Sequence, residues 1–312
     1  MTRRIPQDAI ALLAQRCDVD ENGDDRPYTP AELAARGAGA DALVTLLTDR
    51  VDEALLRACP RLRVVANVAV GYDNVDVAAA ARRGIAVTNT PGVLTDATAD
   101  FALALILAVT RRVVEADRFV RDGRFTEWMM MGLLGAELRG RTLGIAGFGR
   151  IGQAVARRAV AFGMRVIYTG GRGADAVAAD LGAHAVDKAT LLARSDVLSL
   201  HVPLGDATRH FIGADELRAM KPTAYLVNTA RGPIVDEAAL VAALRNGEIA
   251  GAGLDVFERE PAVDPGLVDL PNVVLAPHIG SATVETRTKM AVTAAENVVA
   301  VLSGHPPLTP VR

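Results

Sequence analysis

The chain has 312 residues, which is enough for two domains with separate hydrophobic cores. Half of its residues are hydrophobic, and the formal net charge of -3 argues against a nucleic-acid partner. The longest apolar run, Phe101–Val109, is too short to cross a bilayer, and no N-terminal stretch resembles a signal peptide. The two cysteines, Cys17 and Cys59, show neither metal-binding nor redox spacing. We therefore predict a cytoplasmic protein with no metal, no membrane segment and no nucleic-acid partner.

Residues 5–89 alternate predicted helices and strands, which indicates an α/β unit. Such a unit usually begins with a strand, but Met1–Arg4 is too short and too charged to supply one. Either that strand is missing from the start of the sequence or the domain forms without it. Apolar periodicity and capping residues predict helices over 5–17, 30–36, 53–59 and 77–83, and strands over 42–47, 62–69 and 85–89.

Three glycines at G-x-G-x-x-G spacing, Gly147, Gly149 and Gly152, stand between a short apolar strand and an amphipathic helix. In this context Gly147 allows a tight turn, Gly149 lets a pyrophosphate approach the backbone, and Gly152 lets the helix pack closely on the strand. The helix begins with Arg150 and Ile151, and its N-terminus presents N–H groups to phosphates. A ligand-free structural turn is the alternative, but the flanking strand and helix favour a dinucleotide-binding fingerprint over residues 147–152.

The rest of the chain continues the α/β pattern. A long helix is predicted from Thr95 to about Arg121, followed by a loop over 122–140 that holds Trp128. We expect a discontinuous division, with residues 1–96 and 283–312 in a substrate domain and 97–282 in a dinucleotide-binding domain. After the fingerprint, strands are predicted over 164–168, 197–200, 224–228, 251–256 and 273–275, and helices over 174–181 and 284–303.

Polar residues follow several of these strands, at the edge where an open parallel sheet binds ligands. A guanidinium there can bind a substrate carboxylate at two points and polarise its carbonyl, while an imidazolium can protonate the carbonyl oxygen as hydride arrives. A carboxylate on the imidazole ring would raise the ring's pKa from its usual value of about 6.5. The residues in question are Arg231, Asp255, Glu260 and His278, with His201 and Pro203 closing the strand at 197–200.

Each of these residues also has an ordinary structural interpretation. Taken singly, Arg231 could cap a helix and Glu260 could be a solvated loop charge, whereas His278, between Pro277 and Ile279, is harder to dismiss. Together, beside a dinucleotide site, they favour reduction of a carbonyl on a carboxylate-bearing substrate.

Three separated blocks, NTARGPIVDEAAL, LDVFEREP and APHIGSAT, resemble the D-isomer-specific 2-hydroxyacid dehydrogenases, and the resemblance covers nearly the whole chain. It implies two Rossmann-like α/β domains with parallel sheets, the nucleotide-binding domain being inserted in a flavodoxin-like substrate domain. It also implies that Arg231 binds and polarises the substrate, that His278 is the acid/base and that Glu260 is its partner. Contacts with the nicotinamide end of the cofactor are implied for Thr229, Asp255, Gly280 and Ser281, and contacts with the substrate carboxylate for the backbone N–H groups of Val70 and Gly71.

A narrower resemblance is to the glyoxylate/hydroxypyruvate reductase branch of that family. The segments NTPGVLTDATAD and VVEADRFVRDG, and Trp128 before GLLGAELRGRTLGI, are similar to that branch. The likeness implies that Thr95 approaches the cofactor, that the chain forms a homodimer, and that the loop bearing Trp128 reaches a partner subunit. Core or dimer packing is the alternative role for Trp128.

Cofactor choice depends on the end of the strand after the fingerprint. An acid there would hold the ribose 2′-hydroxyl of NAD, but the segment YTGGR contains none before Asp175, and Arg172 supplies a positive charge. The sequence therefore favours NADP over NAD, with Arg172 on the 2′-phosphate. A solvated Arg172 in an enzyme that uses either cofactor is the alternative.

We predict an NAD(P)H-dependent reduction of glyoxylate to glycolate, or of hydroxypyruvate to D-glycerate, with His278 as proton donor. Two alternatives remain open. One is another D-2-hydroxyacid dehydrogenase that acts on phosphoglycerate or a bulkier 2-keto acid. The other is a dinucleotide-sensing interaction protein, because corepressors with the same fold can keep the same residues.

Overall fold

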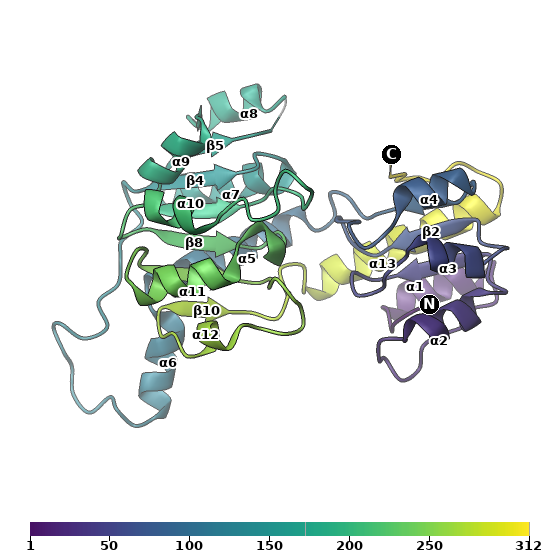
Figure 1. Ribbon diagram of the computed structural model, residues 1–312, viewed down its shortest axis with the longest axis horizontal. Coiled ribbons are helices and arrows are strands. Elements are labelled where there is room, and N and C mark those ends of the chain that lie inside the picture. Colours follow the sequence, from purple (N-terminus) through teal and green to yellow (C-terminus); the bar gives the residue numbers. More distant parts are fainter. Residues whose placement is uncertain (172, 312) are drawn as a thin grey trace. The chain divides into compact units, whose positions relative to one another are not determined.

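The computed structural model describes residues 1–171 and 173–311, which form two compact α/β units (Figure 1). One unit combines Met1–Leu94 with Ser281–Arg312, and the other consists of Thr95–Gly280. The second unit is thus an insertion in the chain of the first. The boundaries expected from the sequence lie two residues further along at each junction.

The first unit is built on a parallel sheet of three strands in the order β1-β2-β3. Their residues are buried on both faces, as expected for parallel strands covered by helices. One face packs on α1 and α13, and the other on α2, α3 and α4. The elements are β1 (Ala42–Thr45), β2 (Val64–Asn67), β3 (Ala86–Thr88), α1 (Gln7–Ala14), α2 (Pro30–Gly37), α3 (Glu53–Ala58), α4 (Val77–Arg82) and α13 (Val284–Leu302).

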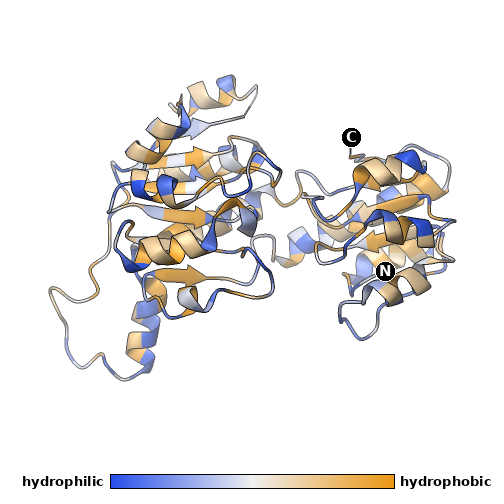
Figure 2. Cartoon of the chain, in the orientation of Figure 1, coloured by the Kyte–Doolittle hydropathy of each residue, from blue (hydrophilic) through white to orange (hydrophobic). Residues whose placement is uncertain are grey.

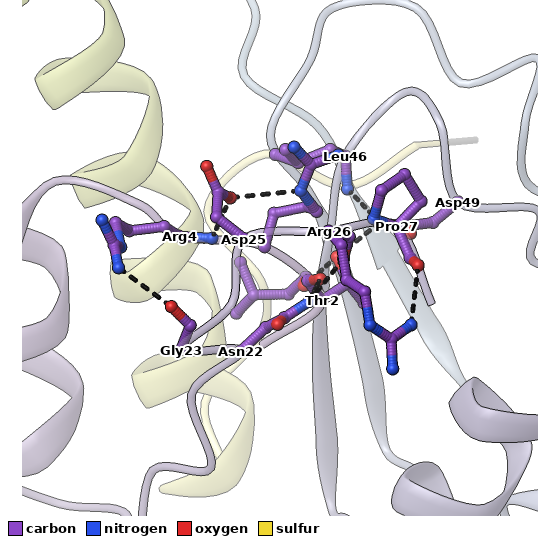
Figure 3. A network of polar contacts seen from close by, with 11 residues as sticks. Thr2, Arg4, Asn22, Gly23, Asp25, Arg26, Pro27, Leu46 and Asp49 are labelled. Carbon is purple, nitrogen blue, oxygen red and sulfur yellow. Dashed lines mark hydrogen bonds and ion pairs between the residues drawn. The ribbon is translucent and has the colours of Figure 1, made fainter. Parts of the chain in front are cut away.

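The first four residues form no strand, as the sequence predicts, yet they are firmly held (Figure 3). The Thr2 N–H donates to the carbonyl of Val44 over 3.1 Å, so the segment lies against β1. The Asn22 amide donates to the carbonyls of Thr2 and Arg26, both over 2.7 Å. The Thr2 N–H thus satisfies the Val44 carbonyl at the edge of the sheet, and Asn22 holds the segment in place.

The second unit is built on a parallel sheet that has seven strands among the described residues, in the order β6-β5-β4-β7-β8-β9-β10. This is the doubly wound Rossmann order, in which the chain reverses direction across the sheet between β4 and β7. Figure 2 shows hydrophobic residues concentrated along these strands. The strands are β4 (Thr142–Ala146), β5 (Arg165–Thr169), β6 (His184–Ala185), β7 (Val197–Leu200), β8 (Tyr225–Asn228), β9 (Gly251–Leu254) and β10 (Val273–Leu275).

Helices cover both faces of this sheet, each with its own hydrophobic cluster. One face carries α5, α7 and α8, and the other carries α9, α10, α11 and α12. No helix among the described residues is long and apolar enough to span a membrane. The helices are α5 (Thr95–Thr110), α6 (Val113–Arg121), α7 (Arg150–Ala161), α8 (Asp175–Asp180), α9 (Lys188–Arg194), α10 (Ala214–Ala219), α11 (Glu237–Arg245) and α12 (Pro265–Val268).

The prediction of one continuous helix from Thr95 to about Arg121 is wrong. The helix breaks between α5 and α6, where Arg112 adopts the left-handed conformation with φ 54°. The Ala136 N–H donates to the Thr110 carbonyl over 2.8 Å, an acceptor that a continuous helix would use four residues later. The Thr110 hydroxyl also turns back to the Ile106 carbonyl at 2.7 Å, which favours the break.

Candidate active site

The residues singled out at strand ends lie together at the carboxyl edge of the seven-stranded sheet. His201 follows β7, Thr229 follows β8, Asp255 follows β9, and His278 comes three residues after β10. Because all these strands are parallel and adjacent, their ends share one edge. The dinucleotide fingerprint lies at the same edge, after β4.

The three fingerprint glycines differ in the space around them. Gly147 has φ 95°, and a Cβ added to it would lie 2.6 Å from the carbonyl of His201, at the switch point between β4 and β7. A Cβ on Gly152 would lie 2.3 Å from the Gly147 carbonyl oxygen, so helix and strand touch there. A Cβ on Gly149 would meet nothing within 4 Å. The backbone is therefore crowded on the protein side and open at Gly149, as a bound pyrophosphate requires.

The N-terminus of α7 is available to an anion. The first N–H bonded within this helix belongs to Gln153, which donates to the Gly149 carbonyl over 2.9 Å. The N–H groups of Arg150, Ile151 and Gly152 meet no acceptor within residues 1–171 and 173–311. Three unpaired donors at the positive end of a helix suit a phosphate group.

Two residues at the neighbouring strand ends also fit a nucleotide. The buried Thr229 hydroxyl has no hydrogen-bond partner in the described part of the chain, so a ligand could satisfy it. His201 Nε2 lies 2.8 Å from the Ser199 hydroxyl, and burial lowers the pKa of His201 to about 4. His201 is therefore uncharged near neutral pH. Pro203 lies in the turn after it, where its carbonyl accepts the Thr208 hydroxyl at 2.6 Å.

Glu260 and His278 form the ion pair that the sequence predicts. Nδ1 of His278 lies 2.9 Å from Oε2 of Glu260, and the other carboxylate oxygen accepts the Phe257 N–H over 2.9 Å. Burial by itself would raise the pKa of Glu260, but the hydrogen bond from His278 and its charge outweigh it and leave that pKa lowered. The carboxylate thus stays ionised, and Nε2 of His278 is the ring nitrogen left for a substrate.

Asp255 fixes the turn that carries His278, a role that sequence reasoning missed. Its buried carboxylate accepts the N–H groups of Ile279 and Gly280, both over 2.7 Å, while its carbonyl accepts the His278 N–H over 2.8 Å. These bonds hold His278 at φ 53°, an uncommon conformation for a residue with a side chain. Burial raises the pKa of Asp255.

The loop of Arg231 packs directly on the loop of Glu260. A Cβ added to Gly232 would lie 1.8 Å from the Phe257 carbonyl oxygen, so only glycine permits this approach. The buried Glu237 carboxylate, which sequence reasoning also missed, accepts the Glu258 N–H over 2.6 Å and fastens the two loops together. Burial raises the pKa of Glu237. Arg231 donates to the Ala230 carbonyl over 2.8 Å.

The remaining predicted residues are distributed as follows. Thr95 begins α5 and Gly280 ends the inserted unit, whereas Val70, Gly71 and Ser281 belong to the other unit. Arg172 lies outside the described residues. Among those described, no group of three or more His, Cys, Asp or Glu side chains could hold a metal ion.

A Rossmann sheet with an open phosphate position and a carboxylate–imidazole pair at the same edge is typical of nicotinamide-dependent oxidoreductases. Residues 103–280 match the family described as D-isomer specific 2-hydroxyacid dehydrogenase, NAD binding domain. The chain belongs to this family of NAD(P)-dependent dehydrogenases, which confirms the family and the α/β fold expected from the sequence.

Relatives and solved structures that match nearly the whole chain support the same family. Glyoxylate reductase of Thermococcus litoralis is 51% identical over 311 residues, covering 98% of this chain and 94% of the relative. Glyoxylate reductase of Aeropyrum pernix is 54% identical over 313 residues, covering 98% and 93%. A solved NADPH-dependent glyoxylate/hydroxypyruvate reductase from Sinorhizobium meliloti, in complex with NADP and malonate, aligns with a TM-score of 0.88 at 39% identity, covering 99% and 94%.

Proposed function

We propose that the protein reduces glyoxylate to glycolate and hydroxypyruvate to D-glycerate, with NADPH as the preferred reductant. The observation that carries this proposal is the Glu260–His278 pair, 2.9 Å apart, at the sheet edge that also bears Arg231 and the fingerprint. The names of the relatives, glyoxylate reductase and glyoxylate/hydroxypyruvate reductase, support the choice of substrate.

When bound, a nicotinamide cofactor would supply the hydride for the carbonyl carbon of the keto acid. Nε2 of His278 gives its proton to the carbonyl oxygen, and the ionised Glu260 stabilises the imidazolium before transfer and fixes the ring. Arg231 binds the substrate carboxylate and polarises the carbonyl. In the reverse direction the neutral imidazole takes the hydroxyl proton back.

The substrate carboxylate has a second group of donors in this proposal, the N–H groups of Val70 and Gly71 in the other unit. Neither N–H donates to any acceptor in the described chain.

We assign the cofactor to the fingerprint (residues 147–152) and to residues that follow the strands. In this assignment the α7 N-terminus holds the pyrophosphate, and the orphaned Thr229 hydroxyl faces the nicotinamide end. The NADP preference rests on the absence of an acid between Thr169, the last residue of β5, and Asp175, together with the charge of Arg172. The other residues assigned to the cofactor are Thr95, His201, Pro203, Asp255, Gly280 and Ser281.

We also assign a homodimer to this cytoplasmic enzyme, with the projecting arm, α6 and residues 122–137, as the contact between subunits. Figure 1 shows the arm extending away from the seven-stranded sheet, and no residue of α6 is buried. Trp128 is 75% exposed and Met131 76% exposed, and exposed apolar side chains grouped in this way typically mark an interaction surface. A second copy is the partner that would cover them, and sedimentation at micromolar concentration tests this by giving the mass of one chain or of two.

The proposed activity is tested by initial rates of NADPH and NADH oxidation at 340 nm with four acids: glyoxylate, hydroxypyruvate, pyruvate and phosphohydroxypyruvate. We expect turnover at ordinary enzyme rates with the first two acids and a higher kcat/KM with NADPH than with NADH. Turnover only with phosphohydroxypyruvate or only with pyruvate would replace the substrate assignment. Nucleotide binding without turnover on any of them would indicate a sensor.

A further inference from the structure

The loop over residues 69–72, here called the carboxylate loop, has all of its carbonyls engaged. The Ala69 carbonyl accepts the Thr90 N–H over 2.8 Å. The Val70 carbonyl accepts the Asn89 side-chain amide over 2.8 Å, and the Gly71 carbonyl accepts the Asn67 amide over 3.0 Å. Three consecutive N–H groups, those of Val70, Gly71 and Tyr72, are left without a protein acceptor in the described chain. A loop bonded in this way offers donors only.

The geometry of the peptide bond turns these bonds into control of N–H direction. Each peptide unit is planar and trans, so its C=O and the next residue's N–H point in opposite directions. The bond to the Ala69 carbonyl therefore fixes the Val70 N–H, and the Asn89 bond to the Val70 carbonyl fixes the Gly71 N–H. The Asn67 bond fixes the following unit and prevents Gly71 from rotating on its far side.

Both asparagines are themselves held. The fully buried Asn67, at the end of β2, accepts the Thr45 hydroxyl at 3.1 Å and the Asn74 amide at 3.3 Å. Asn74 in turn donates to the carbonyls of Leu46 and Asp49. These contacts leave the Asn67 amide nitrogen facing the Gly71 carbonyl.

Asn89 is held through its backbone by the C-terminal segment. Its N–H donates to the Thr309 carbonyl over 3.3 Å, and its carbonyl accepts the Thr309 hydroxyl at 2.6 Å. The buried Asn297 of α13 then accepts the N–H groups of Leu308 and Thr309. A series of hydrogen bonds therefore connects α13, through Thr309 and Asn89, to the Val70–Gly71 peptide.

We propose that Asn89 is a positioning residue for the substrate carboxylate, because it holds the Val70–Gly71 peptide with its N–H toward the substrate, and that Asn67 supports it from the next peptide. The inference rests on the proposed function. Without Asn89 the Val70–Gly71 unit can rotate, and a rotated unit turns its carbonyl oxygen toward an anion, which repels it. Asn89 acts through the loop and does not touch the substrate.

The test compares Asn89→Ala with Asn22→Ala. Asn22 lies in the same unit and donates its amide to two carbonyls, but it contacts Thr2 and Arg26 rather than the carboxylate loop (Figure 3). The readouts are KM and kcat for glyoxylate, the inhibition constant of oxalate, KM for NADPH and the thermal unfolding midpoint.

In Asn89→Ala we expect KM for glyoxylate and the oxalate inhibition constant to rise about tenfold, the size of one hydrogen bond to a charged group. We expect kcat and KM for NADPH to stay within about threefold. Asn89→Asp keeps the shape but loses the donor, so it should weaken oxalate binding at least as much. Thr309→Val should cause a smaller rise in the same constants.

Equal constants in Asn89→Ala and Asn22→Ala, or a fall in kcat with oxalate binding unchanged, would overturn the proposal. If Asn89→Ala does not fold, Asn89→Asp with wild-type oxalate inhibition would overturn it equally. Failure of the proposed function looks different, because the wild-type enzyme itself would then not reduce glyoxylate.

Discussion

Replacing Glu260 by Gln removes one charge from the pair with His278 and keeps an oxygen that can accept a hydrogen bond. Two unit charges about 4 Å apart attract by roughly 4 kcal/mol at an effective dielectric constant of about 20, and by roughly 1 kcal/mol in water. The side chains of His278 and Glu260 are 29% and 35% exposed, so solvent screens the pair and a value near the lower figure applies. An interaction of about 1.4 kcal/mol corresponds to a tenfold change in a rate constant.

We therefore expect kcat/KM for glyoxylate reduction to fall by about tenfold in Glu260→Gln, because the neutral amide no longer stabilises the imidazolium that gives up the proton. The assay is the initial rate of NADPH oxidation under conditions where chemistry limits the rate. Glu258→Gln is the matched control, since Glu258 is in the same loop but its Oε1 lies 2.8 Å from His210 Nε2. An unchanged kcat/KM in Glu260→Gln, or an equal fall in the control, would refute the reasoning.

Three further outcomes follow from the geometry of the inserted unit. In Gly152→Ala the new Cβ meets a backbone oxygen at 2.3 Å, so the free energy of unfolding should fall by about 1 to 3 kcal/mol and NADPH binding should weaken. In Gly149→Ala the new Cβ enters open space, so NADPH binding should weaken while the thermal unfolding midpoint stays unchanged. His201, with its pKa lowered to about 4, stays neutral in the folded protein but is protonated below about pH 6.5 in the unfolded chain. The free energy of unfolding of the wild type should therefore fall by roughly 1.4 kcal/mol between pH 7.5 and pH 5.5. Urea titrations of His201→Gln should show a smaller fall, and an equal fall would exclude His201 as its origin. Arg231→Lys should lower kcat/KM for glyoxylate by about a hundredfold, because two-point binding of the substrate carboxylate is lost. Calorimetry should find the NADPH affinity unchanged. A near-normal kcat/KM would show that Arg231 does not bind the substrate.

The sequence predicted the parts of the fold that local patterns encode. The fingerprint could be found because its glycine spacing lies between a strand and a helix, and the parallel strands because they are short apolar runs. The alternation of strands and helices then gave the fold class. The pair of Glu260 and His278 could be predicted because both residues follow strands that end at one edge of the sheet.

What the sequence could not supply depends on contacts between distant segments. At the end of α5 the Ala136 N–H bonds to the Thr110 carbonyl, a contact that no periodicity over 95–121 reveals. Asp255 could be placed at a strand end from the sequence, but its carboxylate accepts the N–H groups of Ile279 and Gly280, which lie 24 and 25 residues further along the chain. The hydrogen bond from the Glu258 N–H to the Glu237 carboxylate forms only when the loop that holds Glu258 folds against α11.

Some short helices were missed. The helices α9, α10, α11 and α12, each nine residues or shorter, were not predicted, although α3 and α4, of six residues each, were. Capping residues were the available signal: Asp187 and Asp236 each accept a first-turn N–H at 2.7 and 3.0 Å. A search for N-caps would have found α9 and α11.

The most direct test of the account is the proton-donor role of His278, measured in the variant His278→Asn. Asparagine tolerates the left-handed backbone seen at φ 53°, so the turn held by Asp255 should survive. The account predicts that kcat for glyoxylate reduction falls by about a hundredfold or more, while the dissociation constant of NADPH, measured by fluorescence titration, changes by less than about threefold. A variant that keeps most of its kcat would contradict the assignment of His278 as the proton donor.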